Sequence, residues 1–219
     1  MIKGAIFDID GTLFDSMFIW NSIGEDYLRS IGHEPREDLN KTFKDMSLYQ
    51  AACYYKSEYG VTLSIEEIME GVNDMIMHYY RDVVQLKPGV TAFLRRLNDC
   101  GVKMCIATAT DTPLVEAALM RCGISKFFSQ IFTCTSVGHG KDEPVIFRQA
   151  MKHLGTEKHC TVVFEDALYA IRTAKHDGFP VVAIRDMYEE GQEEVRALAD
   201  LYLSDFLDFS SFWKYVSGE

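Results

Sequence analysis

The chain has 219 residues, 47% of them hydrophobic and 25% charged, and a formal net charge of −11 from 33 acidic and 22 basic side chains. This balance is that of a folded globular protein and argues against disorder, a collagen-like repeat or a coiled coil. So negative a surface repels phosphate backbones and anionic lipids but tolerates a divalent cation. We therefore expect neither nucleic acid nor a membrane as a partner.

Short apolar runs predict buried strands at several points along the chain. They lie at residues 4–9, 102–107, 161–164 and 181–184, with a weaker one near 131–134. Helical patterns such as 114–122 and 145–154 lie between them. Buried strands that alternate with helices are typical of a parallel sheet covered on both faces. We therefore predict an α/β fold with a Rossmann-like core.

One interval, from residue 16 to about 84, breaks this alternation. It has helix-like periodicity and many aromatic residues but no convincing buried strand, which favours three or four helices. Ser64 and Glu67 have the spacing of a capping box that opens one of them. We predict an α/β core of residues 1–15 and 85–219, with a small all-helical cap domain of residues 16–84 inserted after the first strand.

The sharpest chemical signal is an acid pair directly after the first strand, in Asp8-Ile9-Asp10-Gly11-Thr12. Successive strand residues face opposite ways, so Asp8 and Asp10 share a face. Two carboxylates at the end of a buried strand repel each other unless a cation lies between them. A solvated Asp-rich turn is the structural alternative.

Polar residues follow three later strands as well, and each has a plain structural alternative. Thr108 could hold an anion or cap the next helix. Lys141 could bind phosphate or be an ordinary surface lysine. Glu165 and Asp166 could bind a cation, for which Mg²⁺ would suit, or cap a helix.

These four signals all lie at predicted carboxyl ends of strands, so they should meet at one edge of the sheet, where α/β proteins bind ligands. Together they predict a site for Mg²⁺ and a phosphoryl group. Competing patterns fail: the sequence has no G-x-S-x-G or H-E-x-x-H, and Asp142 follows Lys141 where a P-loop needs Ser or Thr.

The ordered motifs resemble those of the haloacid dehalogenase-like (HAD) superfamily. The match comprises residues 8–12, Thr108, Lys141 and the acid pair within 163–167, and it extends over essentially the whole chain. The helical interval after the first motif is similar to the cap of the β-phosphoglucomutase-like branch. The resemblance implies an enzyme that hydrolyses phosphoric monoesters.

For catalysis, the resemblance implies that Asp8 attacks phosphorus and becomes an aspartyl phosphate. Asp10 would protonate the leaving oxygen and then activate the hydrolytic water. Because the dehalogenases lack the second aspartate, Asp10 disfavours halide displacement. The implied reaction is hydrolysis of a small phosphorylated metabolite, such as a sugar phosphate.

The resemblance also implies the ligands of the metal and of the phosphate. Mg²⁺ would bind the carboxylates of Asp8 and Asp166 and the backbone carbonyl of Asp10, with Glu165 just outside its direct ligands. The phosphoryl oxygens would be held by three further groups, namely Thr108, the N–H of Ala109, and Lys141.

Two departures from the family bear on the reaction. The β-phosphoglucomutases typically have a histidine shortly after the first motif, where this chain has Trp20, and the usual Lys-Pro-x-Pro motif here reads Lys141-Asp142-Glu143-Pro144. The first departure disfavours a sugar phosphomutase, which stays an alternative, as does a non-catalytic phosphate-binding protein.

Other features are open to more than one interpretation. Trp20, Lys44 and Tyr49 could face the site or serve helix packing, so none is assigned to specificity. The aromatic tail from Phe206 to Tyr215 is expected to cover an edge of the core.

No signal peptide or apolar stretch of membrane length is found, and the six cysteines are scattered. We expect reduced thiols, a cytoplasmic location, and a monomer or weak dimer.

Overall fold

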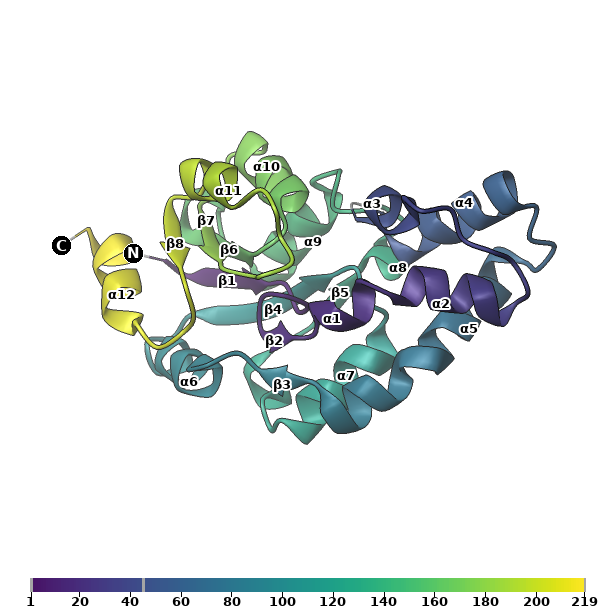
Figure 1. Ribbon diagram of the computed structural model, residues 1–219. Helices are drawn as coiled ribbons and strands as arrows, with labels where there is room; N and C mark the ends of the chain where they lie inside the picture. Colours follow the sequence, from purple (N-terminus) through teal and green to yellow (C-terminus); the bar gives the residue numbers. More distant parts are fainter. Residues whose placement is uncertain (1, 45, 219) are drawn as a thin grey trace.

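Six short strands form one parallel sheet in the order β5–β4–β1–β6–β7–β8 (Figure 1). The structure is a computed structural model that describes residues 2–44 and 46–218. The strands are β1 (Gly4–Phe7), β4 (Lys103–Thr108), β5 (Ile131–Thr133), β6 (Thr161–Glu165), β7 (Val181–Ile184) and β8 (Leu201–Leu203). The predicted α/β class is confirmed. Of these six strands, β8 was not among those predicted from the sequence.

The two faces of the sheet have separate cores, since side chains of β1 alternate between them. Phe7 belongs to a cluster with residues of α6, α7 and α12, whereas Ile6 packs with residues of α9, α10 and α11. The helices of the core are α6 (Val90–Asp99), α7 (Thr112–Arg121), α8 (Cys134–Val137), α9 (Val145–Leu154), α10 (Leu168–His176), α11 (Gln192–Leu198) and α12 (Phe209–Ser217), with 3₁₀ turns at Ser125–Phe127 and Lys158–Cys160. Helices therefore cover both faces, as predicted.

The chain leaves and re-enters the core through two short paired strands. β2 (Phe14–Asp15) and β3 (Gln85–Leu86) run antiparallel, with Asp15 opposite Gln85. Between them lie α1 (Met17–Trp20), α2 (Ile23–Ser30), α3 (Leu39–Phe43), α4 (Leu48–Tyr59), α5 (Ile65–His78) and a π-helical turn (Tyr79–Val83). We call residues 16–84 the helical insertion. Its helices α2 to α5 extend to the right of the sheet in Figure 1.

Local sequence explains much of the helical insertion. The capping box at the start of α5 is present: the N–H of Glu67 donates to Ser64 Oγ at 3.1 Å, and the N–H of Ser64 donates to Glu67 Oε2 at 2.7 Å. Five α-helices are described instead of the three or four expected, because α1 and α3 have only four and five residues.

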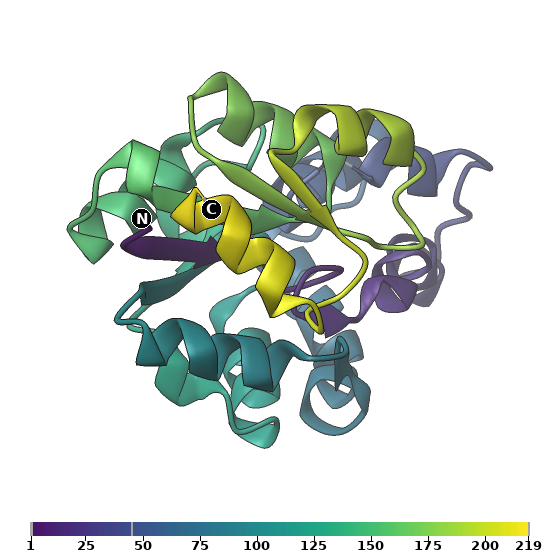
Figure 2. The same ribbon diagram turned by 90° about the vertical axis from the view of Figure 1, so that its left-hand side faces the viewer.

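The aromatic tail covers the edge of the core, as predicted. Phe206, Phe209 and Phe212 are buried, and each ring centroid lies 5.0 Å from that of Phe93. Helix α12 lies beside the start of β1 in both views (Figures 1 and 2).

The six cysteines form no disulfide. Among the described residues, no helix has the length and apolar character needed to cross a bilayer.

Candidate active site

All seven residues selected from the sequence line one cavity of about 470 Å³ at the carboxyl edge of the sheet. Asp8 directly follows β1, Thr108 ends β4 and Glu165 ends β6. The full set is Asp8, Asp10, Thr108, Ala109, Lys141, Glu165 and Asp166. Residues from the helical insertion form the opposite wall. The predicted convergence of the strand ends is therefore observed.

Lys141 is the central cation of this edge. It is 3% exposed, and its Nζ contacts Asp8 Oδ1 and Glu165 Oε1. Burial alone lowers the pKa of Lys141, but Asp8 and Glu165 outweigh burial and hold that pKa well above its ordinary value. The ammonium is therefore charged. Glu165 Oε2 accepts the backbone N–H groups of Asp166 at 2.9 Å and Ala167 at 3.0 Å, which fixes the start of the next loop.

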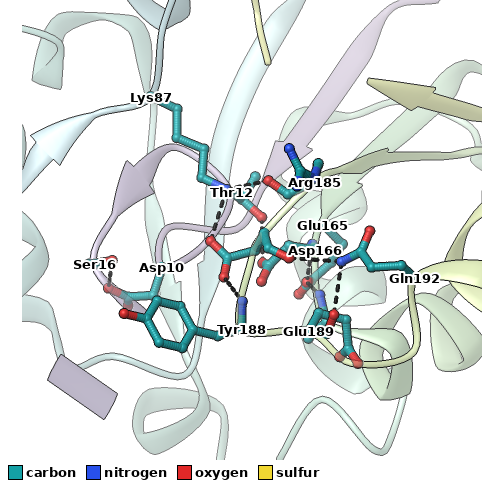
Figure 3. A network of polar contacts seen from close by, with 12 residues as sticks. Asp10, Thr12, Ser16, Lys87, Glu165, Asp166, Arg185, Tyr188, Glu189 and Gln192 are labelled. Carbon is teal, nitrogen blue, oxygen red and sulfur yellow. Dashed lines mark hydrogen bonds and ion pairs between the residues drawn. The ribbon is translucent and has the colours of Figure 1, made fainter. Parts of the chain in front are cut away.

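Three buried carboxylates form an acidic cluster beside Lys141. Oxygens of Asp8, Glu165 and Asp166 lie within 4.8 Å of one another. Asp166 Oδ1 accepts a hydrogen bond from Thr12 Oγ1 at 2.8 Å; Figure 3 shows both residues. Gly11 is required next to them, because its φ is +80° and a Cβ there would lie 2.2 Å from Asp166 Oδ2. The turn after β1 is thus built to approach Asp166 closely.

The electrostatics of this cluster fit a divalent cation. Burial raises the pKa of Asp8 to about 7; Lys141 opposes this rise, while Glu165 and Asp10 add to it. Burial, Glu165 and Asp8 also raise the pKa of Asp166 well above its ordinary value. Carboxylates that destabilise each other's charged forms are those that a bound cation stabilises. The carboxylate oxygens of this cluster suit a hard ion such as Mg²⁺. The backbone carbonyl of Asp10, expected from the sequence as a ligand, would add a further oxygen.

Asp10 has different surroundings from Asp8. Its Oδ1 accepts hydrogen bonds from Ser16 Oγ and Tyr80 OH, both at 2.6 Å, and its Oδ2 accepts one from Thr110 Oγ1 at 2.5 Å. Figure 3 shows Ser16 against Asp10. Tyr80 OH in turn accepts the indole N–H of Trp20 at 2.9 Å. Both ends of the helical insertion therefore hold Asp10 in place.

Sequence reasoning missed Ser16, Thr110 and Tyr80. Thr110 lies in the threonine-rich run after β4, so its hydroxyl was a recognisable signal there. Ser16 follows the first motif closely but matches no expected motif. Tyr80 is 70 positions from Asp10, and nothing in the sequence links the two residues.

A second buried ion pair supports the loop after β7. Lys87 Nζ lies 3.0 Å from Asp186 Oδ2 and donates to the carbonyl of Arg185 at 2.6 Å. The amide of Gln192 donates to the carbonyl oxygens of Asp186 at 2.8 Å and Glu189 at 3.0 Å. Figure 3 shows Gln192 beside Glu189. These bonds fix the loop that contributes Tyr188, Glu189 and Glu190 to the lining of the cavity. Asp186 is a single acidic residue after β7, not one of two neighbouring acidic residues, so the sequence did not mark it as a candidate for the site.

One ion pair joins the helical insertion to this loop. Lys44 Nζ lies 3.1 Å from Glu189 Oε1, and Glu189 Oε2 accepts the N–H of Leu168 at 3.1 Å. Of the three residues that could have faced the site, Trp20 and Lys44 line the cavity. Tyr49 is absent from its lining and is 53% exposed, so it serves the surface.

A model of the haloacid dehalogenase-like hydrolase family matches residues 5–184, which contain the carboxyl ends of β1, β4 and β6. The chain belongs to this family. The resemblance to this family inferred from the sequence is confirmed.

Curated relatives are similar along nearly the whole chain. The phosphoglycolate phosphatase of Rhodobacter capsulatus is 26% identical, covering 100% of this chain and 98% of that protein. The phosphorylated carbohydrates phosphatase of Thermotoga maritima is 23% identical, covering 81% of this chain and 82% of that protein. Family membership and these relatives support the expected phosphoric monoester hydrolase.

Solved structures share the fold. CbbY from Rhodobacter sphaeroides, in complex with phosphate, has a TM-score of 0.83 at 23% identity, covering 95% of this chain and 96% of that one. β-Phosphoglucomutase from Clostridium difficile has a TM-score of 0.79 at 19% identity, covering 100% of this chain and 98% of that one.

Proposed function

We propose that the protein is a Mg²⁺-dependent phosphatase that hydrolyses a small phosphorylated metabolite, such as a sugar phosphate, through an aspartyl phosphate on Asp8. The supporting observation is the contrast between two nearby aspartates. Asp8 faces Lys141 and the acidic cluster, while Asp10 is held by three hydroxyl groups. One carboxylate thus has the surroundings of a nucleophile and the other those of an acid and base.

In the first step, a carboxylate oxygen of Asp8 forms a bond to phosphorus as the bond from phosphorus to the ester oxygen breaks. The leaving oxygen takes a proton from Asp10. Lys141, Thr108 and the N–H of Ala109 hold the phosphoryl oxygens. Lys141 already lies against Asp8, so it can neutralise charge on the oxygens as they approach.

In the second step, water attacks phosphorus and Asp10 accepts a proton from that water. The P–O bond to Asp8 breaks, which restores the carboxylate and releases phosphate. Hydroxyl groups can donate or accept hydrogen bonds by rotation, so Ser16 and Thr110 can serve both protonation states of Asp10.

The carboxylates of Asp8 and Asp166, with the backbone carbonyl of Asp10, would hold Mg²⁺. When bound, the ion neutralises negative charge on Asp8 and on the phosphoryl group. Glu165 is expected to stay outside the direct ligands, because Lys141 and two backbone N–H groups occupy its oxygens.

The helical insertion is proposed to act as a cap domain of residues 16–84. Its residues line the cavity opposite the strand ends, and Lys44 forms an ion pair with Glu189, which also lines the cavity. A cap of this kind excludes water and contacts the alcohol part of the substrate.

A phosphatase is favoured over the phosphomutase alternative. No histidine lies among the described residues that line the cavity, and the indole N–H of Trp20 is already bonded to Tyr80. A cytoplasmic location and a monomeric or weakly dimeric state stay part of the proposal.

Phosphate release from a panel of phosphorylated metabolites, with Mg²⁺ and with EDTA, tests the proposal. Asp8→Asn should abolish release while the protein stays folded. Asp15→Asn, in the exposed position of β2, is the matched control and should stay active. Trapping acyl phosphate on Asp8 would support the intermediate, whereas full activity of Asp8→Asn would refute it.

A further inference from the structure

The wall of the cavity formed by the helical insertion is mostly apolar. Nine of its described lining residues are apolar or aromatic: Met17, Trp20, Ile23, Phe43, Met46, Leu48, Ala51, Tyr55 and Val72. They come from α1, α2, α3, α4, α5 and the segment before α4. The surface that would meet the alcohol part of a phosphate ester is therefore largely hydrocarbon.

The N–H and O–H donors of the aromatic side chains in this wall are already used. The N–H of Trp20 donates to Tyr80, and the hydroxyl of Tyr55 donates to the carbonyl of Gly24 at 2.5 Å. The rings of Tyr55 and Phe43 pack edge to face, with centroids 5.0 Å apart. A Cβ on Gly24 would lie 2.7 Å from Phe43, so glycine is needed there for this ring to pack. The wall presents carbon faces to the cavity.

Five polar side chains belong to the same wall, and two of them already have a partner within the protein. Lys44 bonds to Glu189, and Asn40 donates to Glu25 Oε1 at 2.8 Å. The other three, all exposed, are Asn21, Glu37 and Lys41. A polyhydroxylated alcohol would lose its water here and find few partners in exchange. Each hydroxyl left without a hydrogen bond lowers affinity on the order of tenfold.

We infer that the enzyme selects phosphate monoesters whose alcohol carries an apolar group, a short alkyl chain or a single aromatic ring, over those of polyhydroxylated sugars. This inference rests on the proposed phosphatase function, and within it replaces the sugar phosphate given as an example with a less polar ester. The cavity of about 470 Å³ has room for a phosphate and one such group. The helical insertion discriminates between the alcohol parts of different esters, while the strand ends bind the phosphate group that all of them share.

The test compares two esters on the full-length protein with Mg²⁺. 2-Phenylethyl phosphate and glucose 6-phosphate both release a primary alcohol, so their leaving groups have similar basicity and differ mainly in polarity. We expect kcat/KM to be at least about tenfold higher for 2-phenylethyl phosphate, chiefly through a lower KM. Equal values or a preference for glucose 6-phosphate would overturn the inference and leave the phosphatase intact. Release from neither ester would overturn both.

A variant connects any preference to this wall. Leu48→Asn places an amide among the apolar residues and should reduce the ratio of the two kcat/KM values by about fivefold or more. Leu207→Asn makes the same change at a side chain that is 69% exposed and should leave the ratio unchanged. If Leu48→Asn does not fold, Val72→Thr in α5 makes a smaller polar change of nearly equal volume. An unchanged ratio in the folded variant would refute the role of this wall.

Discussion

Replacing Lys141 with methionine tests whether this buried cation stabilises the acidic cluster. Methionine has a similar length but leaves Asp8 and Glu165 without their shared partner. Removing one member of a buried ion pair costs about 3–5 kcal/mol, because the other charge stays buried and unpaired. We expect the free energy of unfolding to fall by about this amount near neutral pH in the absence of divalent cations.

The loss should depend on pH in a defined direction. Burial raises the pKa of Asp8 from 3.8 to about 7 even with Lys141 present. This difference corresponds to about 4 kcal/mol. Between those two values the folded state binds more protons than the unfolded state, so the stability due to Asp8 falls as the pH rises. Because Lys141 opposes the rise, its removal raises the pKa further, and the loss should be larger at about pH 8 than at about pH 5.

Urea unfolding followed by circular dichroism, in EDTA at both pH values, measures the two losses. Lys214→Met in α12 removes an exposed lysine and is the control; it should change stability by less than about 0.5 kcal/mol. Equal losses at both pH values for Lys141→Met would refute the electrostatic reasoning. So would a loss below about 1 kcal/mol, the value of an ordinary surface pair.

Three further predictions concern the metal and the helical insertion. Mg²⁺ should raise Tm more at about pH 8 than at about pH 5, because the acidic cluster is more ionised there, and EDTA should reverse the shift; equal shifts in calorimetry would contradict a carboxylate site. Tyr80→Phe removes a buried hydroxyl bonded to Asp10 and should cost about 1–3 kcal/mol of stability while kcat falls more than KM changes; an unchanged kcat in steady-state kinetics would limit Tyr80 to stability. Lys44→Met breaks the pair with Glu189 and should raise KM about two- to fivefold at constant kcat; an unchanged KM would show that this pair does not help to hold substrate.

The residues of the candidate site could be predicted because each stands next to a strong local pattern. Asp8 and Asp10 follow an apolar run, so both their place at a strand end and their shared face follow from strand geometry. Thr108 and Glu165 end strands of five or six residues, long enough to recognise. Parallel strands then bring these ends to one edge without further information.

The residues that hold Asp10 could not be found in the same way. The contact between Tyr80 and Asp10 depends on how the helical insertion returns to the core. The two residues are 70 positions apart in the sequence, so tertiary packing alone brings them together. Ser16 matches no expected motif, and the pair Lys87 and Asp186 joins residues 99 positions apart. Local periodicity carries no information about such contacts, whereas it does predict the sheet that makes them possible.

The pairing of Asp15 with Gln85 has a consequence for how this protein can change. Because β2 and β3 pair, the chain leaves the core and returns to it at the same place. The helical insertion is therefore attached to the core as one closed loop, whatever helices it contains. Closure entropy grows slowly, by about 0.6 kcal/mol for each doubling of loop length. A different set of helices could therefore be exchanged at this junction without rebuilding the six-stranded sheet, provided that its ends still bring hydroxyl groups to Asp10. Over evolutionary time, the choice of substrate can then drift independently of the chemistry.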